Sequence, residues 1–182
     1  MRNCYQFNNL SVLGHGLSVM RKAAKLYRGE FEGFVLPDWF KDNFAQIKDS
    51  AHPWKTIKRY AIWHDVGKPY CRTVDESGKQ HFPGHEEKSK QIFVDNFNQP
   101  STIGELIGND MLVHTVKSDE LNHLLLCNKL NKSDCFTLLL VAFAELHANA
   151  EMFGGISSVG FKMKYKQLDK RGKQLVNFWK RD

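Results

Sequence analysis

Apolar residues recur at helical spacing along most of the chain. Between 10 and 28 they include Leu13, Leu17, Met20 and Ala24, with basic residues between them, a pattern typical of an amphipathic helix. Because this pattern dominates the chain, we expect an all-α fold, a bundle of amphipathic helices. Further helices are expected at 38–48, 56–66, 82–97, 102–109, 119–127, 133–152 and 169–179.

Two segments interrupt the helical pattern. Residues 70–84 are polar and contain the cluster Asp-Glu-Ser-Gly at 75–78, which predicts a short β-hairpin or a flexible loop. Residues 153–160 contain three glycines and predict a tightly turned or flexible loop. After it, residues 161–166 alternate between apolar and basic types before the last expected helix begins.

The length of the chain favours a single domain. Its 182 residues suffice for one substantial core, whereas two halves would each bury little apolar surface. We expect a core at about 10–150 and a basic C-terminal extension at 160–182. The longest apolar run, 138–146, is interrupted by Glu145, and it is far shorter than the roughly 20 residues that span a bilayer. No membrane association is expected.

The charge and the cysteine content of the chain indicate the kind of partner and the cellular location to expect. The net charge is +6 and the pI is about 9.1, which favours anionic partners such as nucleotides or nucleic acid. The cysteines at 4, 71, 127 and 135 form no Cys-x-x-Cys pair. With no secretory signal at the N-terminus, we expect reduced thiols and a cytoplasmic location.

The candidate chemistry centres on residues 63–69, Trp-His-Asp-Val-Gly-Lys-Pro. His64 and Asp65 offer an imidazole nitrogen beside a carboxylate oxygen, a ligand pair suited to first-row divalent metals. Lys68 follows three residues later and can meet a phosphate oxygen. Gly67 and Pro69 are expected to end the preceding helix, as a glycine just past a helix and a trailing proline do. The alternative is an exposed helix end with a weak Asp-Lys ion pair.

Three further histidines extend this candidate site. His15 stands between Gly14 and Gly16, and two glycines inside a helix cost about 1 kcal/mol each relative to alanine. We therefore expect backbone or ligand to approach closely there. His85 falls in the first turn of a helix, where an anion is stabilised. His114 follows three apolar residues. The alternative for His15 is a core or partly exposed histidine near a frayed helix start. The alternative for His114 is a hydrogen-bonded core histidine.

A late carboxylate completes the set. Glu145 is flanked by Ala144 and Leu146 on the most apolar helix, for which Ser133 is the expected N-cap. A carboxylate among apolar neighbours is usually paired or bound to metal, because burying it alone is costly. The alternative is that Glu145 faces solvent.

The chain resembles the HD-domain phosphohydrolase superfamily over about residues 10–150. The resemblance lies in the order of the candidate ligands, which is His15, His64-Asp65, His85, His114 and a late carboxylate. The likeness is closest to the HD domains attached to bacterial CCA-adding tRNA nucleotidyltransferases. In those domains His-Asp-x-Gly-Lys-Pro is followed by a segment like residues 82–89 here, Phe-Pro-Gly-His-Glu-Glu-Lys-Ser.

The resemblance implies an all-α HD-domain bundle that binds one or two divalent transition-metal ions, namely Mn, Fe, Co, Ni or Zn, with Mg less favoured by nitrogen ligands. It places Glu145 where the family has an aspartate, and the other candidates for that last position are His147 and Asp134. The metal ligands that it implies are His15, His64, Asp65, His85, His114 and Glu145.

The implied activity is hydrolysis of a phosphoester on a nucleotide or nucleic-acid end, as a phosphomonoesterase or a 2′,3′-cyclic phosphodiesterase. Catalysis is assigned to Asp65, Lys68 and His85, and substrate binding to Lys68, Arg72, His85 and His114. Alternatives are a single-strand nuclease, a non-catalytic nucleotide- or nucleic-acid-binding module, and a structural helical protein. The oligomeric state is open, and a homodimer is compatible with the sequence.

The basic C-terminal segment has two interpretations of its own. Its aromatic residues Tyr165, Phe178 and Trp179, together with its lysines and arginines, can bind nucleic acid by charge and stacking. Alternatively, the basic residues form a solvated face and the aromatic residues pack into the core.

Overall fold

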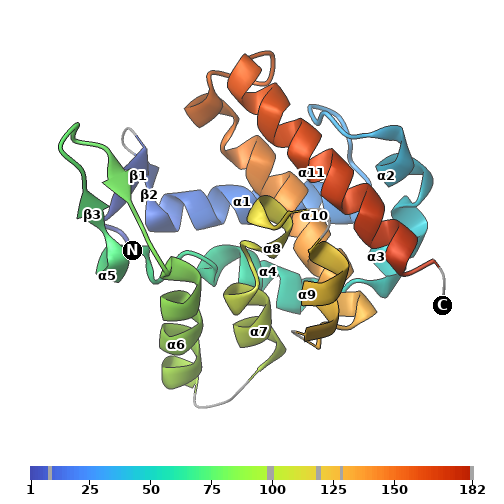
Figure 1. The fold of residues 1–182 in the computed structure, drawn as a ribbon, viewed down its shortest axis with the longest axis horizontal. Coiled ribbons are helices and arrows are strands. Elements are labelled where there is room, and N and C mark those ends of the chain that lie inside the picture. The colour runs from blue at the N-terminus through green and yellow to red at the C-terminus, as the bar shows by residue number, and fades with distance from the viewer. Residues whose placement is uncertain (8–9, 98–100, 118–119, 128, 181–182) are drawn as a thin grey trace.

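The computed structural model describes residues 1–182 except 8–9, 98–100, 118–119, 128 and 181–182 (Figure 1). The described chain is predominantly helical with small strand excursions, so the all-α prediction is confirmed. The helices are α1 (Val12–Arg28), α2 (Asp38–Asp42), α3 (Phe44–Ser50), α4 (Trp54–Trp63), α5 (Lys68–Cys71), α6 (His85–Phe97), α7 (Thr102–Gly108), α8 (Leu112–Thr115), α9 (Leu121–Cys127), α10 (Lys132–Ala148), the 3-10 helix η1 (Ala150–Phe153) and α11 (Val159–Phe178). The strands are β1 (Tyr5–Phe7), β2 (Leu10–Ser11), β3 (Thr73–Val74) and β4 (Gln80–His81).

The core is built around α10. Thirteen of its seventeen residues are buried, as expected for a helix that is apolar on all sides. Helices α1, α4, α7, α8 and α11 all pack against it. Because α1 also packs along α4, the helices α1, α4 and α10 all contact one another.

The N-termini of the two central helices are capped by side chains. Ser11 accepts a hydrogen bond from the backbone of Gly14 at the start of α1. At α10, Asn131 and Asp134 form a reciprocal capping box. The prediction that Ser133 caps α10 was therefore wrong. Asn131 is the N-cap, because its side chain accepts from the Asp134 backbone N–H while the Asp134 carboxylate accepts from the Asn131 backbone N–H.

The glycine after His64-Asp65 does not act as predicted. Gly67 has φ −76°, whereas a glycine that ends a helix by the expected motif is left-handed. Helix α4 ends at Trp63, and Pro69 lies in the first turn of the new helix α5. The reason for a glycine is space, since a Cβ on Gly67 would lie 2.6 Å from the backbone nitrogen of Ser89 on α6.

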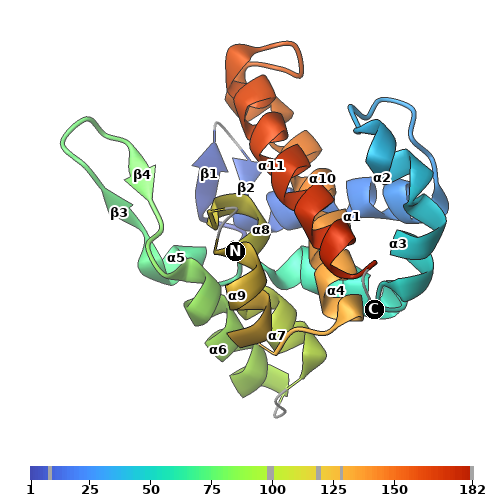
Figure 2. The same ribbon diagram turned by 45° about the vertical axis from the view of Figure 1, so that its right-hand side comes forward.

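The polar segment at 70–84 forms the antiparallel hairpin β3–β4, which confirms the hairpin alternative. It projects from the helices (Figure 2). A second two-stranded sheet, β1–β2, and the short helix α8 were not predicted. The helix expected at 38–48 is divided at Asn43 into α2 and α3, because Asn43 has non-helical backbone angles.

The C-terminal segment is one continuous helix. Residues 161–166, whose alternation resembles a strand, belong to α11, and Ser158 caps it. Phe161, Leu168 and Leu175 are buried in the same core as α10, so the segment expected as an extension is part of the packed core. The aromatic side chains of this segment pack against the core, as the second interpretation predicted; they are Tyr165, Phe178 and Trp179.

Two further predictions concern membrane-spanning helices and the state of the cysteines. No helix among the described residues has the length and apolar character needed to cross a membrane. Each of the four cysteines is a free thiol, and Cys135 is buried. Burial raises the pKa of Cys135 to about 12, so that this thiol stays protonated at neutral pH.

Candidate metal centre

Five helical elements direct side chains toward one point in the core. They contribute residues that are far apart in sequence, which gather around the carboxylates of Asp65 and Glu145. The contributing residues are His15 on α1, His64 and Asp65 at the end of α4, His85 at the start of α6, His114 on α8 and Glu145 on α10. The structure thus brings together all six sequence-predicted metal ligands.

The Asp65 carboxylate is the centre of this cluster. Its Oδ2 lies 3.5 Å from His15 Nε2, 3.3 Å from His64 Nε2 and 2.7 Å from Lys68 Nζ. Its Oδ1 lies 3.4 Å from His85 Nε2. His15, His64 and Asp65 are each about 1% exposed. One donor atom from each of these three lies within 4.8 Å of the others, which is the separation needed to share one ion.

Glu145 closes the opposite side of the cluster. Its Oε1 is 3.7 Å from His15 Nε2, and its Oε2 is 3.0 Å from His114 Nε2. The Glu145 side chain is only 14% exposed, so the carboxylate faces the histidines rather than solvent. The extra methylene of glutamate, compared with the aspartate of the HD pattern, still leaves the carboxylate within reach of His15.

The two other candidates for this position are engaged elsewhere. His147 Nδ1 donates to the Phe143 carbonyl at 2.7 Å, and its Nε2 accepts from the Val35 backbone N–H at 2.9 Å. Both ring nitrogens are therefore used. Asp134 belongs to the α10 capping box and pairs with His52 Nε2 at 2.7 Å. Neither residue is brought to Asp65, and Glu145 occupies the expected position.

The sequence analysis missed Asp110, a buried carboxylate in the same cluster. It follows α7, is 4% exposed, and accepts a hydrogen bond from the Tyr60 hydroxyl. One of its oxygens lies within 4.8 Å of donor atoms of His64 and Glu145. The available signal was its position directly before the apolar residues 111–113, the same criterion that singled out Glu145.

His64 and His85 are oriented as metal ligands require. His64 Nδ1 faces the Ala61 carbonyl at 2.9 Å, and His85 Nδ1 faces the Phe82 carbonyl at 2.9 Å. Because a carbonyl oxygen only accepts, Nδ1 carries the hydrogen and the Nε2 lone pair of the neutral ring points to the cluster. Ligating histidines are typically held this way. Moreover, neither ring nitrogen of buried His15 has a hydrogen-bond partner among the described residues.

Close backbone packing explains one glycine beside His15. A Cβ on Gly16 would lie 2.5 Å from the Ile62 carbonyl oxygen of α4. Only a residue without a side chain lets α1 and α4 approach this closely, and that approach brings the rings of His15 and His64 to 5.3 Å between centroids. The predicted close approach at His15 is thus confirmed at Gly16.

The charges of the side chains in the cluster favour binding of a cation. Three carboxylates, Asp65, Asp110 and Glu145, face one ammonium group, Lys68. Burial alone would lower the pKa of His64, but Asp65 and Asp110 outweigh burial and raise that pKa to about 10. The carboxylates thus draw positive charge into the site. A divalent cation with neutral imidazole ligands would neutralise the same carboxylates, so the donor set and its charge fit a metal ion.

Exposure separates two groups within the cluster. His15, His64 and Asp65 are closed off, whereas the side chains of His85, Lys68 and His114 are 12%, 13% and 23% exposed. The less accessible residues can hold an ion, and the more accessible ones can also touch a substrate. Lys68 Nζ also lies 5.5 Å from the centre of the Phe82 ring.

Arg72, expected to bind substrate, lies elsewhere. It donates to Gln80 Oε1 at 2.8 Å and lines a separate depression with Tyr5 and Pro69 at the base of the hairpin. No contact among the described residues brings it to Asp65.

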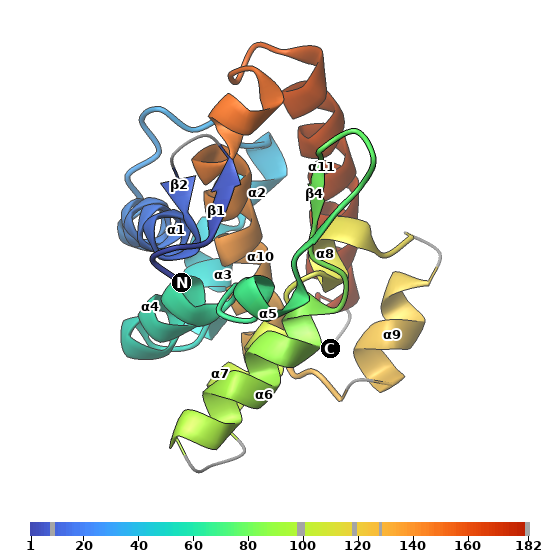
Figure 3. The same cartoon turned by 90° about the vertical axis from the view of Figure 1, so that its left-hand side faces the viewer.

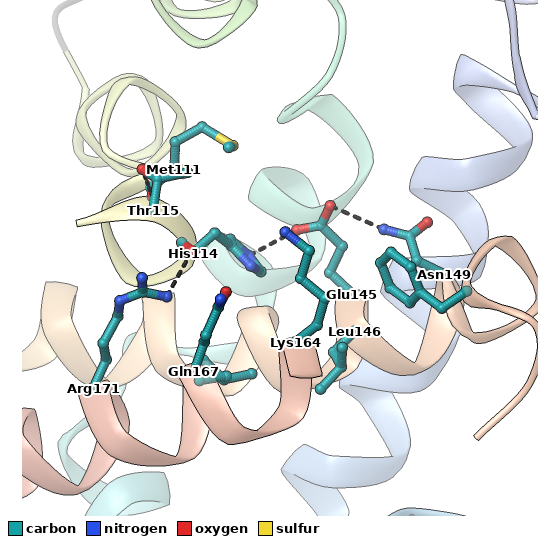
Figure 4. Close-up of a pocket in the computed structure, with 11 residues that line it drawn as sticks. Met111, His114, Thr115, Glu145, Leu146, Asn149, Lys164, Gln167 and Arg171 are labelled. Atoms are coloured by element: carbon teal, nitrogen blue, oxygen red, sulfur yellow. Dashed lines mark hydrogen bonds and ion pairs between the residues drawn. The ribbon is translucent and has the colours of Figure 1, made fainter. Parts of the chain in front are cut away.

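A pocket of about 160 Å³ opens beside His114 and Glu145 (Figure 4). It lies where α8 packs against α10 and α11 (Figure 3). Helix α11 contributes Lys164, Gln167 and Arg171 to its lining. Its apolar lining consists of Met111, Leu146, Phe153 and Leu168. The pocket therefore joins the polar cluster to an apolar wall and to the basic helix.

Arg171 holds α8 in place. Its guanidinium group donates to the carbonyls of Val116 and of His114, the latter at 2.6 Å. The last carbonyls of a helix lack partners within the helix, and Arg171 supplies them here. The sequence analysis did not single out Arg171 or Lys164, because nothing local in the sequence connects them to His114.

Comparison with protein-family models, with curated proteins and with solved structures finds no match for this chain. The geometry of the cluster is therefore the basis for assigning a function. It combines four imidazoles, three carboxylates and one ammonium group around a common centre, and the residues are His15, His64, Asp65, Lys68, His85, Asp110, His114 and Glu145.

Proposed function

We propose that this protein is a metal-dependent phosphohydrolase of the HD-domain type, acting on a phosphoester of a nucleotide or nucleic-acid end. The observation that carries the proposal is the convergence of three imidazole nitrogens on the buried Asp65 carboxylate. A purely structural cluster would satisfy its polar atoms internally. Here both nitrogens of His15 and the Nε2 of His64 have no hydrogen-bond partner among the described residues.

The ligands divide into two sets. His15, His64 and Asp65, together with Glu145, would hold one ion in the closed part of the cluster. Asp110, His85 and His114 would complete the site for a second ion or contact the substrate. Mixed nitrogen and oxygen donors suit Mn, Fe, Co, Ni or Zn better than Mg. When bound, such an ion supplies Lewis acidity toward phosphoryl oxygens and an acidified water as nucleophile.

The chain's own groups bind and orient the phosphoryl group. Lys68 is held by Asp65 at 2.7 Å, so its ammonium is preorganised toward the charge that develops on phosphoryl oxygens. His85 lies at the accessible edge with its Nδ1 fixed by Phe82, and its Nε2 is available to exchange a proton with the reacting oxygens. Burial of His15 and His64 excludes water from the other side.

The net charge of +6 and the pocket beside His114 support an anionic substrate with an organic part. The apolar wall, Met111, Phe153 and Leu168 among it, suits a nucleoside better than inorganic phosphate. The free thiols are consistent with a cytoplasmic location, which we include in the proposal.

The test combines metal analysis with a substrate screen. The purified protein, loaded separately with Mn, Co, Ni and Zn, is assayed on phosphomonoesters, 2′,3′-cyclic phosphates, nucleotides and single-stranded oligonucleotides. Asp65→Ala should lose bound metal and activity together, because the Asp65 carboxylate contacts His15, His64 and His85. The matched control is Asp95→Ala, which removes an exposed carboxylate from α6.

Either of two outcomes would contradict the proposal. If Asp65→Ala retains the metal content and the turnover of Asp95→Ala, the cluster is not the catalytic metal site. If the wild-type protein binds no metal and hydrolyses none of the substrates, the cluster is a buried ion-pair network and the protein is not a phosphohydrolase.

A further inference from the structure

An exposed row of basic and amide side chains crosses the surface of α11 obliquely to the helix axis. Lys164, Gln167, Lys170 and Lys173 follow one another at intervals of three residues, and all four are exposed. Residues at i and i+3 form a continuous ridge on a helix surface. We call these four residues the α11 ridge. At about 1.5 Å per residue, the ridge is roughly 13 Å long.

The charge on the ridge is not neutralised within the described structure. The three ammonium groups of Lys164, Lys170 and Lys173 make no ion pair or hydrogen bond with any described residue. The single acid of α11 is Asp169, and its Oδ1 accepts from the Trp39 indole N–H at 2.5 Å, on the side that packs on the core. The ridge is therefore a row of positive charge that faces solvent.

The ridge starts at the candidate metal centre. Lys164 and Gln167 line the pocket that contains His114 and Glu145, and the Lys164 side chain extends toward these two residues (Figure 4). Further along the same helix, Lys170 and Lys173 line a second depression. The two depressions are thus connected by one ridge, and the second does not border the metal cluster.

From this juxtaposition we propose that the α11 ridge binds the phosphodiester backbone of a single-stranded nucleic acid whose terminal phosphoester lies at the metal centre. The proposal rests on the function proposed above and narrows its substrate from nucleotides in general to the end of a polymer. Lys164 contacts the phosphate next to the end, and Lys170 and Lys173 contact phosphates further from it.

A single strand fits these observations better than a mononucleotide or a duplex. A mononucleotide that occupies the first pocket cannot reach Lys173, so the second half of the ridge would have no role. The first pocket, about 160 Å³, is smaller than the roughly 300–1,000 Å³ of pockets that enclose a drug-sized ligand. It admits one unstacked terminal unit against its apolar wall, whereas a duplex end keeps its bases paired and stacked.

The test measures binding of a thymidylate strand of about ten nucleotides, within the range of known single-strand sites, with a phosphate at one end and a fluorophore at the other. Binding by the full chain is followed by fluorescence anisotropy at several salt concentrations. The double variant Lys170→Ala/Lys173→Ala removes the distal half of the ridge. The matched control, Lys162→Ala/Lys166→Ala, removes two exposed lysines of the same helix that line neither depression.

Each phosphate contact with a single strand contributes about 0.7 to the slope of log affinity against log salt. The ridge variant should therefore show a slope smaller by about 1.4, which corresponds to about sevenfold between 50 and 200 mM salt. The control should keep the wild-type slope. With an oligonucleotide substrate, the loss in the ridge variant should appear in KM rather than in kcat.

Two results would overturn the inference while leaving the phosphohydrolase function intact. One is an equal change of slope in the control variant, which would mean that any two exposed lysines of α11 suffice, whether or not they line a depression. The other is efficient hydrolysis of a mononucleotide by the wild-type protein, with no preference for an oligonucleotide end and no effect of the ridge variant on the oligonucleotide. Failure of the phosphohydrolase function itself appears separately, as absence of metal and of hydrolysis with every substrate.

Discussion

Replacing Gly16 with alanine tests the packing that positions His15. The new Cβ would lie 2.5 Å from the carbonyl oxygen of Ile62 and 3.3 Å from the Cα atom of Ile62. These atoms belong to the backbone of α4, so they cannot move aside as a flexible side chain can. Overpacking costs about 1–3 kcal/mol, and we expect the upper end. Against this, alanine gains about 1 kcal/mol of helix propensity over glycine.

The expected net destabilisation of Gly16→Ala is therefore about 2 kcal/mol, or a decrease in Tm of roughly 4–8 °C for a chain of this length. Because α1 must move away from α4, His15 also moves away from His64. We expect weaker metal binding in Gly16→Ala, in addition to the loss of stability.

Gly14→Ala is the matched control on the other side of His15. Its Cβ would lie 3.1 Å from Leu10 Cδ1 and 3.3 Å from Ser11 Oγ, and both are side-chain atoms that can adjust. We expect stability within about 1 kcal/mol of wild type and unchanged metal binding. Thermal unfolding measures the stability of the two variants, and metal titration measures their affinity for the ion. If Gly16→Ala is as stable as Gly14→Ala and binds metal as tightly, the close approach of α1 and α4 does not position the site.

Three further predictions concern metal, α8 and the thiols. Adding Mn²⁺ at about 100 times its Kd should stabilise the fold by about 2.7 kcal/mol, measured as a Tm increase that EDTA reverses; an unchanged Tm argues against a folded-state metal site. Arg171→Ala should free the α8 carbonyls and lower the metal stoichiometry through His114; full stoichiometry would assign Arg171 a structural role alone. Cys127 is exposed and should react with iodoacetamide at pH 8, whereas buried Cys135, with its pKa raised to about 12, should react only after unfolding; mass spectrometry distinguishes the two.

The helices and most of the candidate ligands could be read from the sequence because both depend on local patterns. Apolar spacing predicts α1 and α10, and His64 and Asp65 are neighbours in the chain, so their proximity requires no tertiary information. The order of the histidines and the late carboxylate pointed to the same cluster that the structure contains, although no spacing in the sequence states how near His15 lies to Glu145.

Tertiary structure decided the remaining points, because packing between distant segments selects among chemically similar residues. Glu145 and His147 are two positions apart on one helix, but α10 turns Glu145 toward His15, whereas His147 accepts from the backbone N–H of Val35. Asp110 enters the site through the same long-range packing, beneath Tyr60.

The stretch that begins with His64 shows the same division between local and long-range effects. Its residue types predict metal chemistry without any structure. The reason for Gly67, however, is contact with α6, where the Gly67 backbone N–H donates to Ser89 Oγ at 2.8 Å. Likewise, the sequence by itself determined that the last helix is basic. Only the packing of its apolar side chains on α10 determined which lysines face solvent beside the metal centre, since a buried face leaves the opposite face exposed.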